Sequence, residues 1–309
     1  MAIPKSSRRA QGQADLQRLL DPDVALRLKS LELRARMVVE GFIAGLHRSP
    51  YHGFSVEFAE HRQYMPGDPV HQLDWKVYGK TDRYYLKEFE EETNLKCQIL
   101  IDCSGSMAYG SGEVTKFEYA QSLAASLAYL MLQQRDAVGF TAFSRRVVSH
   151  VPSRSASSHL HVVLRRLAQL TAQETTDTAA VLHTLAEQNR RRGLILLLSD
   201  LLTDPASVIA GLKHFRHRRH EIVVFQILDR QEREFSFPRA ARFEDMETAE
   251  VIPTLPAQIR TAYRRQMNEL IQRYRRECLE SHVDYHLLDT SVPYGRALYA
   301  YLGKRGKMF

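Results

Sequence analysis

Residues 97–107 read CQILIDCSGSM, an apolar run that ends in an acid and two small hydroxyl residues. The apolar part predicts a buried strand, because a strand covered on both faces need not alternate apolar and polar residues. Asp102, Ser104 and Ser106 follow at alternate positions, and Gly105 permits an unusual backbone turn between the serines. A carboxylate and two hydroxyls aimed at one point are ligands that a hard divalent cation such as Mg2+ accepts. The stretch therefore predicts a core strand that delivers a metal site.

Beyond this stretch, strand and helix patterns alternate towards the C-terminus. Further strands are expected at 137–143, 147–151, 194–198, 221–227 and 283–288. Helices are expected from near Thr115 and at 160–170, 178–189, 205–217, 259–278 and 296–302, with a hairpin-like region after residue 227 and through residue 251. Such alternation predicts an α/β fold in which helices cover both faces of a doubly wound, mostly parallel sheet.

The part of the chain before this core has a different character. Residues 1–20 form a polar, flexible lead, and apolar residues at spacings of three and four within 21–45 predict an amphipathic helix. Alternation at 54–58 and the pattern of 83–89 suggest strands in an irregular, partly β segment. We therefore expect a lead at 1–20, a helix and partly β segment packing on the core at 21–95, the α/β domain at 96–303 and a basic tail at 304–309.

Composition narrows the class of protein. No apolar run approaches the ~20 residues that cross a bilayer, and the basic start of the chain is followed by no apolar signal region. Three cysteines without CxxC spacing fit a reducing compartment. These features predict a cytoplasmic protein without a membrane span.

The net charge of +7 raises the question of a nucleic-acid partner. Basic clusters lie at 8–9, 190–192, 213–219, 273–276 and 304–307, which are on different expected elements. A nucleic-acid binder usually gathers its charge on one face with stacking aromatics, and no recognition motif is present. The charge therefore favours an acidic protein partner over specific nucleic-acid binding.

A second expected strand also ends in an acid, since residues 194–198 run directly into Ser199 and Asp200. In doubly wound sheets, ligands bind beyond the carboxyl ends of the strands where the winding reverses. Asp102 and Asp200 are therefore expected at one edge, together with Thr176 in the loop before a helix. In this order, Asp102, Ser104, Ser106, Thr176 and Asp200 resemble the metal-ion-dependent adhesion site of von Willebrand factor A domains. The resemblance implies a bound divalent cation, Mg2+ first and Mn2+ or Ca2+ as alternatives, that accepts a carboxylate from another protein.

The residues before the core strand resemble a more specific family. Residues 53–94, followed by the strand LIDCSGSM, resemble the bacterial domain of unknown function 58 family, which has a von Willebrand A-like core. The elements YMPGD at 64–68 and LDWK at 73–76 are its most specific features, although His71 and Lys80 stand where arginine is usual. The resemblance covers about 45–302. Because the family is commonly encoded beside MoxR-type AAA+ ATPases, it implies a non-enzymatic adaptor for such an ATPase in protein maturation or complex assembly.

Two alternatives stay open. Ser104 and Ser106 could simply cap a turn, and Asp200 could cap the helix that follows it. A Mg2+-dependent phosphoryl-transfer or hydrolytic enzyme could use Asp102 as its nucleophile. The chain lacks a GxxxxGK[ST] loop, the second acid of a DxD motif and a GxSxG serine, so the sequence favours the adaptor.

Overall fold

The computed structural model describes residues 31–48, 62–63, 79, 85–86, 95–172, 178–237, 241–244 and 251–305. The expected lead, the strand at 54–58, the YMPGD and LDWK elements and most of 83–89 lie outside the described residues. Within the partly β segment, β1 (Arg62–Gln63) pairs antiparallel with β2 (Tyr85–Leu86).

A six-stranded sheet forms the centre of the molecule, in the order β10-β7-β6-β3-β4-β5. Its strands are β3 (Lys96–Asp102), β4 (Ala137–Phe143), β5 (Val147–Arg154), β6 (Leu194–Ser199), β7 (Glu221–Leu228) and β10 (Asp284–Asp289). All neighbouring pairs are parallel except β4 and β5, which are antiparallel. Strands β4 and β6 are buried along their whole length, as their continuous apolar sequences require.

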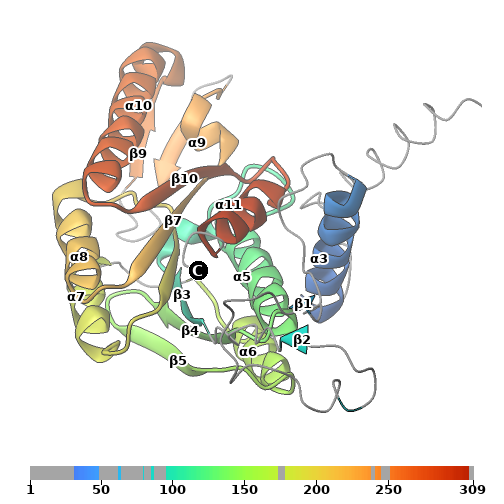
Figure 1. Cartoon of the computed structure of the whole chain (residues 1–309). Helices are drawn as coiled ribbons and strands as arrows, with labels where there is room; N and C mark the ends of the chain where they lie inside the picture. Colours follow the sequence, from blue (N-terminus) through green and yellow to red (C-terminus); the bar gives the residue numbers. More distant parts are fainter. Residues whose placement is uncertain are drawn as a thin grey trace, which may run out of the picture.

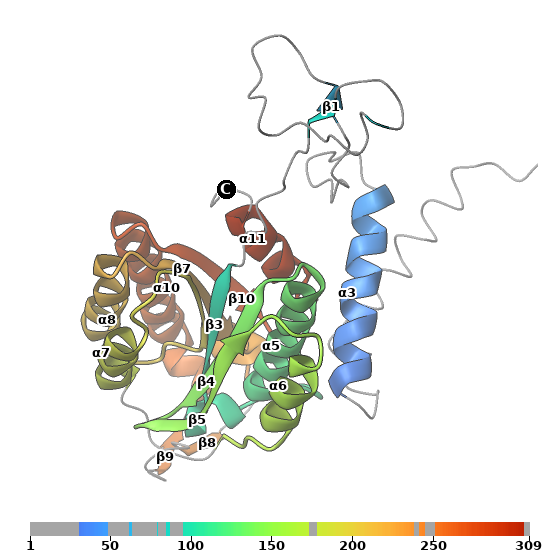
Figure 2. The same cartoon turned by 60° about the horizontal axis from the view of Figure 1, so that its bottom comes forward.

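Helices cover both faces of this sheet, which confirms the predicted α/β class (Figures 1 and 2). One face carries α5 (Lys116–Gln133), α6 (His159–Ala168) and α11 (Gly295–Arg305), with α3 (Leu31–Arg48) packed outside α5. The other face carries α7 (Thr178–Gln188), α8 (Pro205–His217) and α10 (Pro256–Glu280). None of the helices in the described ranges is both long and apolar enough to cross a membrane.

The order of the strands places a switch in winding at the centre of the sheet. From β3 the chain moves through β4 to the edge strand β5, and then returns to β6 on the opposite side of β3. Helices on opposite faces therefore leave the neighbouring strands β3 and β6. In doubly wound sheets, the space beyond the carboxyl ends of two such strands is the crevice where ligands bind.

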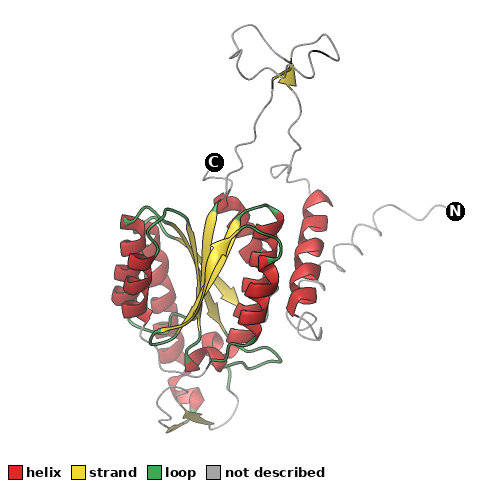
Figure 3. Cartoon of the chain, turned by 90° about the horizontal axis from the view of Figure 1, so that it is seen from below, coloured by secondary structure: helices red, strands yellow, loops and turns green. Residues whose placement is uncertain are grey.

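Several short elements gather at this end of the molecule. The turn η2 (Gly105–Ala108) follows β3, and α9 (Arg230–Glu234) follows β7. The chain then forms the hairpin of β8 (Ala241–Glu244) and β9 (Val251–Thr254), which extends beyond one end of the sheet in Figure 3. The predicted hairpin-like region is therefore confirmed, with the short helix α9 before it.

Candidate metal centre at the sheet edge

Asp102 is the last residue of β3 and is almost fully buried, with 1% of its surface exposed. Its Oδ1 accepts a hydrogen bond from the backbone N–H of Ser104 at 2.9 Å. Its Oδ2 accepts one from the hydroxyl of Ser199, at the end of β6, at 2.6 Å. These two bonds hold the carboxylate in one orientation and join the ends of the two central strands.

Ser104 and Ser106 present their hydroxyls to each other, because their Oγ atoms lie 3.1 Å apart. Ser104 is buried and occupies the N-cap position of η2, but its side chain makes no capping hydrogen bond. The alternative in which Ser104 caps this turn through its hydroxyl is therefore wrong. The two hydroxyl oxygens lie next to each other and can act as ligands for a cation.

Asp200 follows β6 and is 3% exposed. The backbone N–H of Leu202 donates to its Oδ1 at 3.3 Å, around a turn in which Leu201 has a φ of 54°. A left-handed backbone at a leucine is strained, and such strain is often found at functional sites. Asp204, not Asp200, caps α8, since its Oδ2 accepts from the backbone N–H of Ser207 at 2.9 Å. The helix-capping alternative for Asp200 is therefore wrong.

A buried lysine completes this edge of the sheet. Lys116 lies in the first turn of α5 with 0% of its surface exposed. Its Nζ donates to Asp200 Oδ2 at 2.8 Å and to Glu232 Oε1, on α9, at 2.7 Å. The helix predicted from near Thr115 places Lys116 in its first turn, but the sequence did not predict its contacts with Asp200 and Glu232. The available signal was a cation at a helix N-terminus, where the helix dipole disfavours positive charge.

Asp102 lies close enough to Asp200 for the charge of Asp200 to affect the pKa of Asp102. Burial raises the pKa of Asp102 to about 7, with a further contribution from the negative charge of Asp200, while hydrogen bonds from Ser199 and Ser104 oppose the shift. Burial alone lowers the pKa of Lys116, but the charges of Asp200 and Glu232 outweigh it and raise the pKa to about 12. The site therefore holds buried negative charge that Lys116 offsets in part, and that a proton on Asp102 or a bound cation can offset further.

Asp229 ties the surrounding loops to the same edge. Its Oδ1 accepts from the backbone N–H of Gln231, at the start of α9. Its Oδ2 accepts from the N–H of Ser111 at 3.0 Å and from the hydroxyl of Thr290, after β10, at 3.3 Å. The loop before α5, the start of α9 and the end of β10 are therefore held together around the crevice.

Four of the five predicted ligands lie in this crevice, namely Asp102, Ser104, Ser106 and Asp200, whereas Thr176 lies outside the described residues. Within the described ranges, no group of three or more His, Cys, Asp or Glu residues is arranged to hold a metal. An adhesion-type site differs from such groups because hydroxyls supply part of its ligands. The two carboxylates and two hydroxyls are hard oxygen ligands, which fit a divalent cation such as Mg2+, although Lys116 already donates to one oxygen of Asp200.

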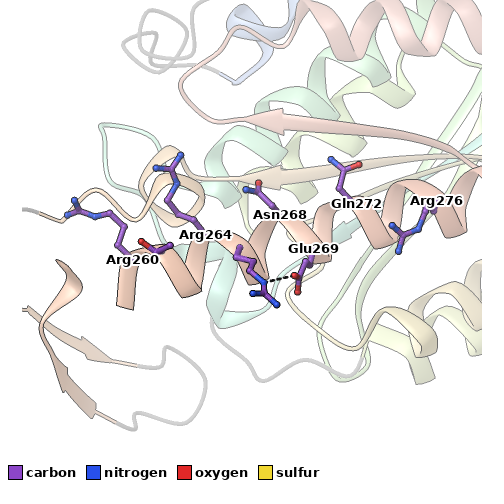
Figure 4. A pocket seen from close by; sticks show the side chains of 8 residues that line it. Arg260, Arg264, Asn268, Glu269, Gln272 and Arg276 are labelled. Atoms are coloured by element: carbon purple, nitrogen blue, oxygen red, sulfur yellow. Dashed lines mark hydrogen bonds and ion pairs between the residues drawn. The ribbon is translucent and has the colours of Figure 1, made fainter. Parts of the chain in front are cut away.

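A separate groove of about 650 Å³ runs along α10 (Figure 4). Arg260, Arg264, Asn268, Gln272 and Arg276 line it at intervals of four residues, which places them in one row along the helix. Glu269 is the one acid among the described residues that line the groove, and it is paired with Arg265 at 2.9 Å. Within the described ranges, Arg264 and Arg276 have no carboxylate within ion-pair distance. The row therefore presents basic and amide donors.

Comparison with known proteins identifies relatives for most of the chain. A family model described as "Protein of unknown function DUF58" matches residues 60–273. Uncharacterized proteins of Mycobacterium bovis and Mycobacterium tuberculosis are each 29% identical to this chain over 212 residues, which is 68% of this chain and 66% of the relative. The chain thus spans just under two thirds of the length of these curated relatives.

Among solved structures, the chain is similar to the conserved hypothetical protein BatB from Bacteroides thetaiotaomicron. That similarity has a TM-score of 0.47 and 15% identity, and it covers 69% of this chain and 99% of BatB. The chain is also similar to the SpRpn10 VWA domain, with a TM-score of 0.35 and 12% identity over 63% of this chain and 87% of that domain.

Proposed function

Because this chain belongs to the DUF58 family and has a von Willebrand A-like fold, we propose that it is a non-enzymatic, metal-dependent protein-interaction module. The fold suggests the interaction role. The observation that supports metal dependence is the meeting of Asp102, Asp200 and the Ser104–Ser106 hydroxyl pair at the winding switch of the sheet.

Each residue at the crevice has a separate role in the proposed binding of the cation. Ser104 and Ser106 would bind the cation directly, while Asp102 and Asp200 would hold it directly or through water, with Thr176 as the fifth ligand. A bound cation with few charged ligands supplies an electrophilic centre that accepts a carboxylate oxygen from a partner protein. The hydrogen bonds from Ser199 and Ser104 fix Asp102 before the cation arrives, so the site needs little rearrangement.

The partner we propose is an acidic segment of a MoxR-type AAA+ ATPase or of its client, with this protein as the adaptor in maturation or complex assembly. The basic row on α10 supports an acidic partner, because Arg264 and Arg276 can attract carboxylates that the described part of the chain does not supply. We place the adaptor in the cytoplasm, in keeping with the sequence.

The alternative in which Asp102 acts as the nucleophile of a Mg2+-dependent enzyme is less well supported. A nucleophilic carboxylate must present one oxygen to the substrate. Both oxygens of Asp102 accept hydrogen bonds from neighbouring groups, and the residue is 1% exposed. The arrangement is better suited to holding a cation than to attacking a phosphorus atom.

The experiment is co-purification of the full chain with a MoxR-type AAA+ ATPase from the same organism, in Mg2+ and in EDTA. We expect the complex in Mg2+, its loss in EDTA, and its loss in Asp102→Ala. Asp204→Ala is the matched control, because it removes an acid from the same end of the sheet that only caps α8. Unchanged capture and unchanged cation binding by Asp102→Ala would exclude the proposed site. Turnover of a nucleotide or phosphoester that Asp102→Ala abolishes would favour the enzyme.

A further inference from the structure

Lys116 is the least expected residue at this edge of the sheet. Lysine is almost never fully buried unless it is paired, because removing an ammonium from water is costly. Here the ammonium has two carboxylate partners, Asp200 at 2.8 Å and Glu232 at 2.7 Å, and the ring of Tyr109 lies 5.9 Å from its Nζ. A permanent cation is therefore built in beside the residues that fit a divalent cation.

The Lys116 ammonium reduces the ability of the Asp200 carboxylate to bind a cation. Asp200 Oδ2 accepts a hydrogen bond from Lys116, and Asp200 Oδ1 accepts one from the backbone N–H of Leu202. Each carboxylate oxygen of Asp200 therefore already has a hydrogen-bond donor. A divalent cation near Asp200 also meets the repulsion of a fixed positive charge in a water-poor environment, where charges interact strongly. Lys116 thus opposes cation binding at the same site that its partner Asp200 helps to form.

The net charge of the ionised side chains around Lys116 shows how the ammonium affects which cation the site prefers. With Asp102, Asp200 and Glu232 ionised and Lys116 protonated, these four groups carry a net charge of −2, a count that leaves out the buried Asp229 at the same edge. Without the ammonium the same four groups carry −3, and because the interaction energy grows with the charge of the cation, a trivalent cation gains more from this change than a divalent one. We propose that Lys116 sets the charge selectivity and the affinity of this site, and that Glu232 extends the site to α9. This inference rests on the proposed function, since it needs a cation at Asp102 and Asp200.

The test compares wild type with Lys116→Met, which keeps most of the side-chain length and removes the charge. Lys213→Met is the matched control, because Lys213 is an exposed lysine on α8. Ca2+ and Tb3+ serve as probes of similar size and different charge, titrated by calorimetry and by tyrosine-sensitised terbium luminescence. In Lys116→Met we expect Ca2+ to bind at least tenfold tighter, about 1.4 kcal/mol. We expect the ratio of Tb3+ to Ca2+ affinity to rise at least tenfold as well, with both quantities unchanged in Lys213→Met.

A purely structural role for Lys116 would lower the stability of the variant without raising the preference for Tb3+. Equal or weaker Ca2+ binding by a folded Lys116→Met, or an unchanged Tb3+ to Ca2+ ratio, overturns the inference while the proposed function stands. Wild type that binds neither ion overturns both. If Lys116→Met does not fold, Glu232→Gln replaces it. In Glu232→Gln the same four positions carry a net charge of −1, so the affinity for Ca2+ should fall at least tenfold. An unchanged affinity overturns the inference.

Discussion

Asp102 is expected to destabilise the cation-free protein, so that Asp102→Asn should be more stable than wild type in EDTA. The pKa of Asp102 is raised from 3.8 to about 7 by burial and by the charge of Asp200. The folded protein therefore holds a proton that the unfolded chain has already released between these two values. Since the folded state binds more protons in this window, its stability falls as pH rises from about 4 to 7 and stays reduced above that.

The magnitude follows from the size of the shift. A difference of about 3 pKa units at about 1.36 kcal/mol per unit gives an upper limit of about 4 kcal/mol at pH 8. Asparagine can still accept from the N–H of Ser104 through its Oδ1, so we expect about 2–3 kcal/mol of the limit to be realised. For a domain of this size that corresponds to a rise of roughly 5 °C in melting temperature.

The assay is urea denaturation followed by circular dichroism, in EDTA, from pH 4 to pH 8. Asp102→Asn should exceed wild type by the full amount at pH 8 and match it near pH 4, and adding Mg2+ should stabilise wild type but not the variant. Asp204→Asn is the control of opposite sign, because hydrogen bonds from Ser207 lower the pKa of Asp204. A variant that is less stable than wild type at pH 8, or a difference that does not depend on pH, would refute the reasoning.

Three further predictions concern the scaffold and the basic row. Thr115→Ala should destabilise the protein by about 1 kcal/mol in denaturant titrations, because it removes the capping box that starts α5; no loss would contradict that role. Phe143→Ala should cost about 3–5 kcal/mol, since Phe143 is fully buried at the end of β4; a loss below about 1 kcal/mol would mean that the core collapses around the cavity. The double variant Arg264→Glu and Arg276→Glu should weaken the complex with the acidic partner at least tenfold in low salt and less in high salt, measured by surface plasmon resonance. If this variant binds the partner as tightly as wild type does, α10 is not part of the interface.

Much of the fold follows from local patterns. The apolar runs of β4 and β6 are long enough to specify buried strands, and the structure starts and ends β4 where the sequence predicts. The spacing of apolar residues likewise indicates α8, whose first residue is a proline preceded by the capping Asp204. These features depend on residues close in the chain, so the sequence is sufficient to find them.

The candidate site depended partly on sequence and partly on topology. Asp102, Ser104 and Ser106 are neighbours in the chain, so their joint use could be inferred from spacing alone. Asp200 is 98 positions from Asp102, and its place beside β3 depends on the return of the chain at the centre of the sheet. The rule for winding switches made that pairing predictable once the strands were identified.

The sequence by itself determined the α/β class, the order of the strands and helices, and the acids that end β3 and β6. Only the tertiary structure decided that Lys116 lies between Asp200 and Glu232, because α5, β6 and α9 meet through packing across 84 and 116 positions of the chain. No local pattern encodes such a contact. A buried charge is tolerated only where distant partners arrive together, and their arrival is a property of the whole fold.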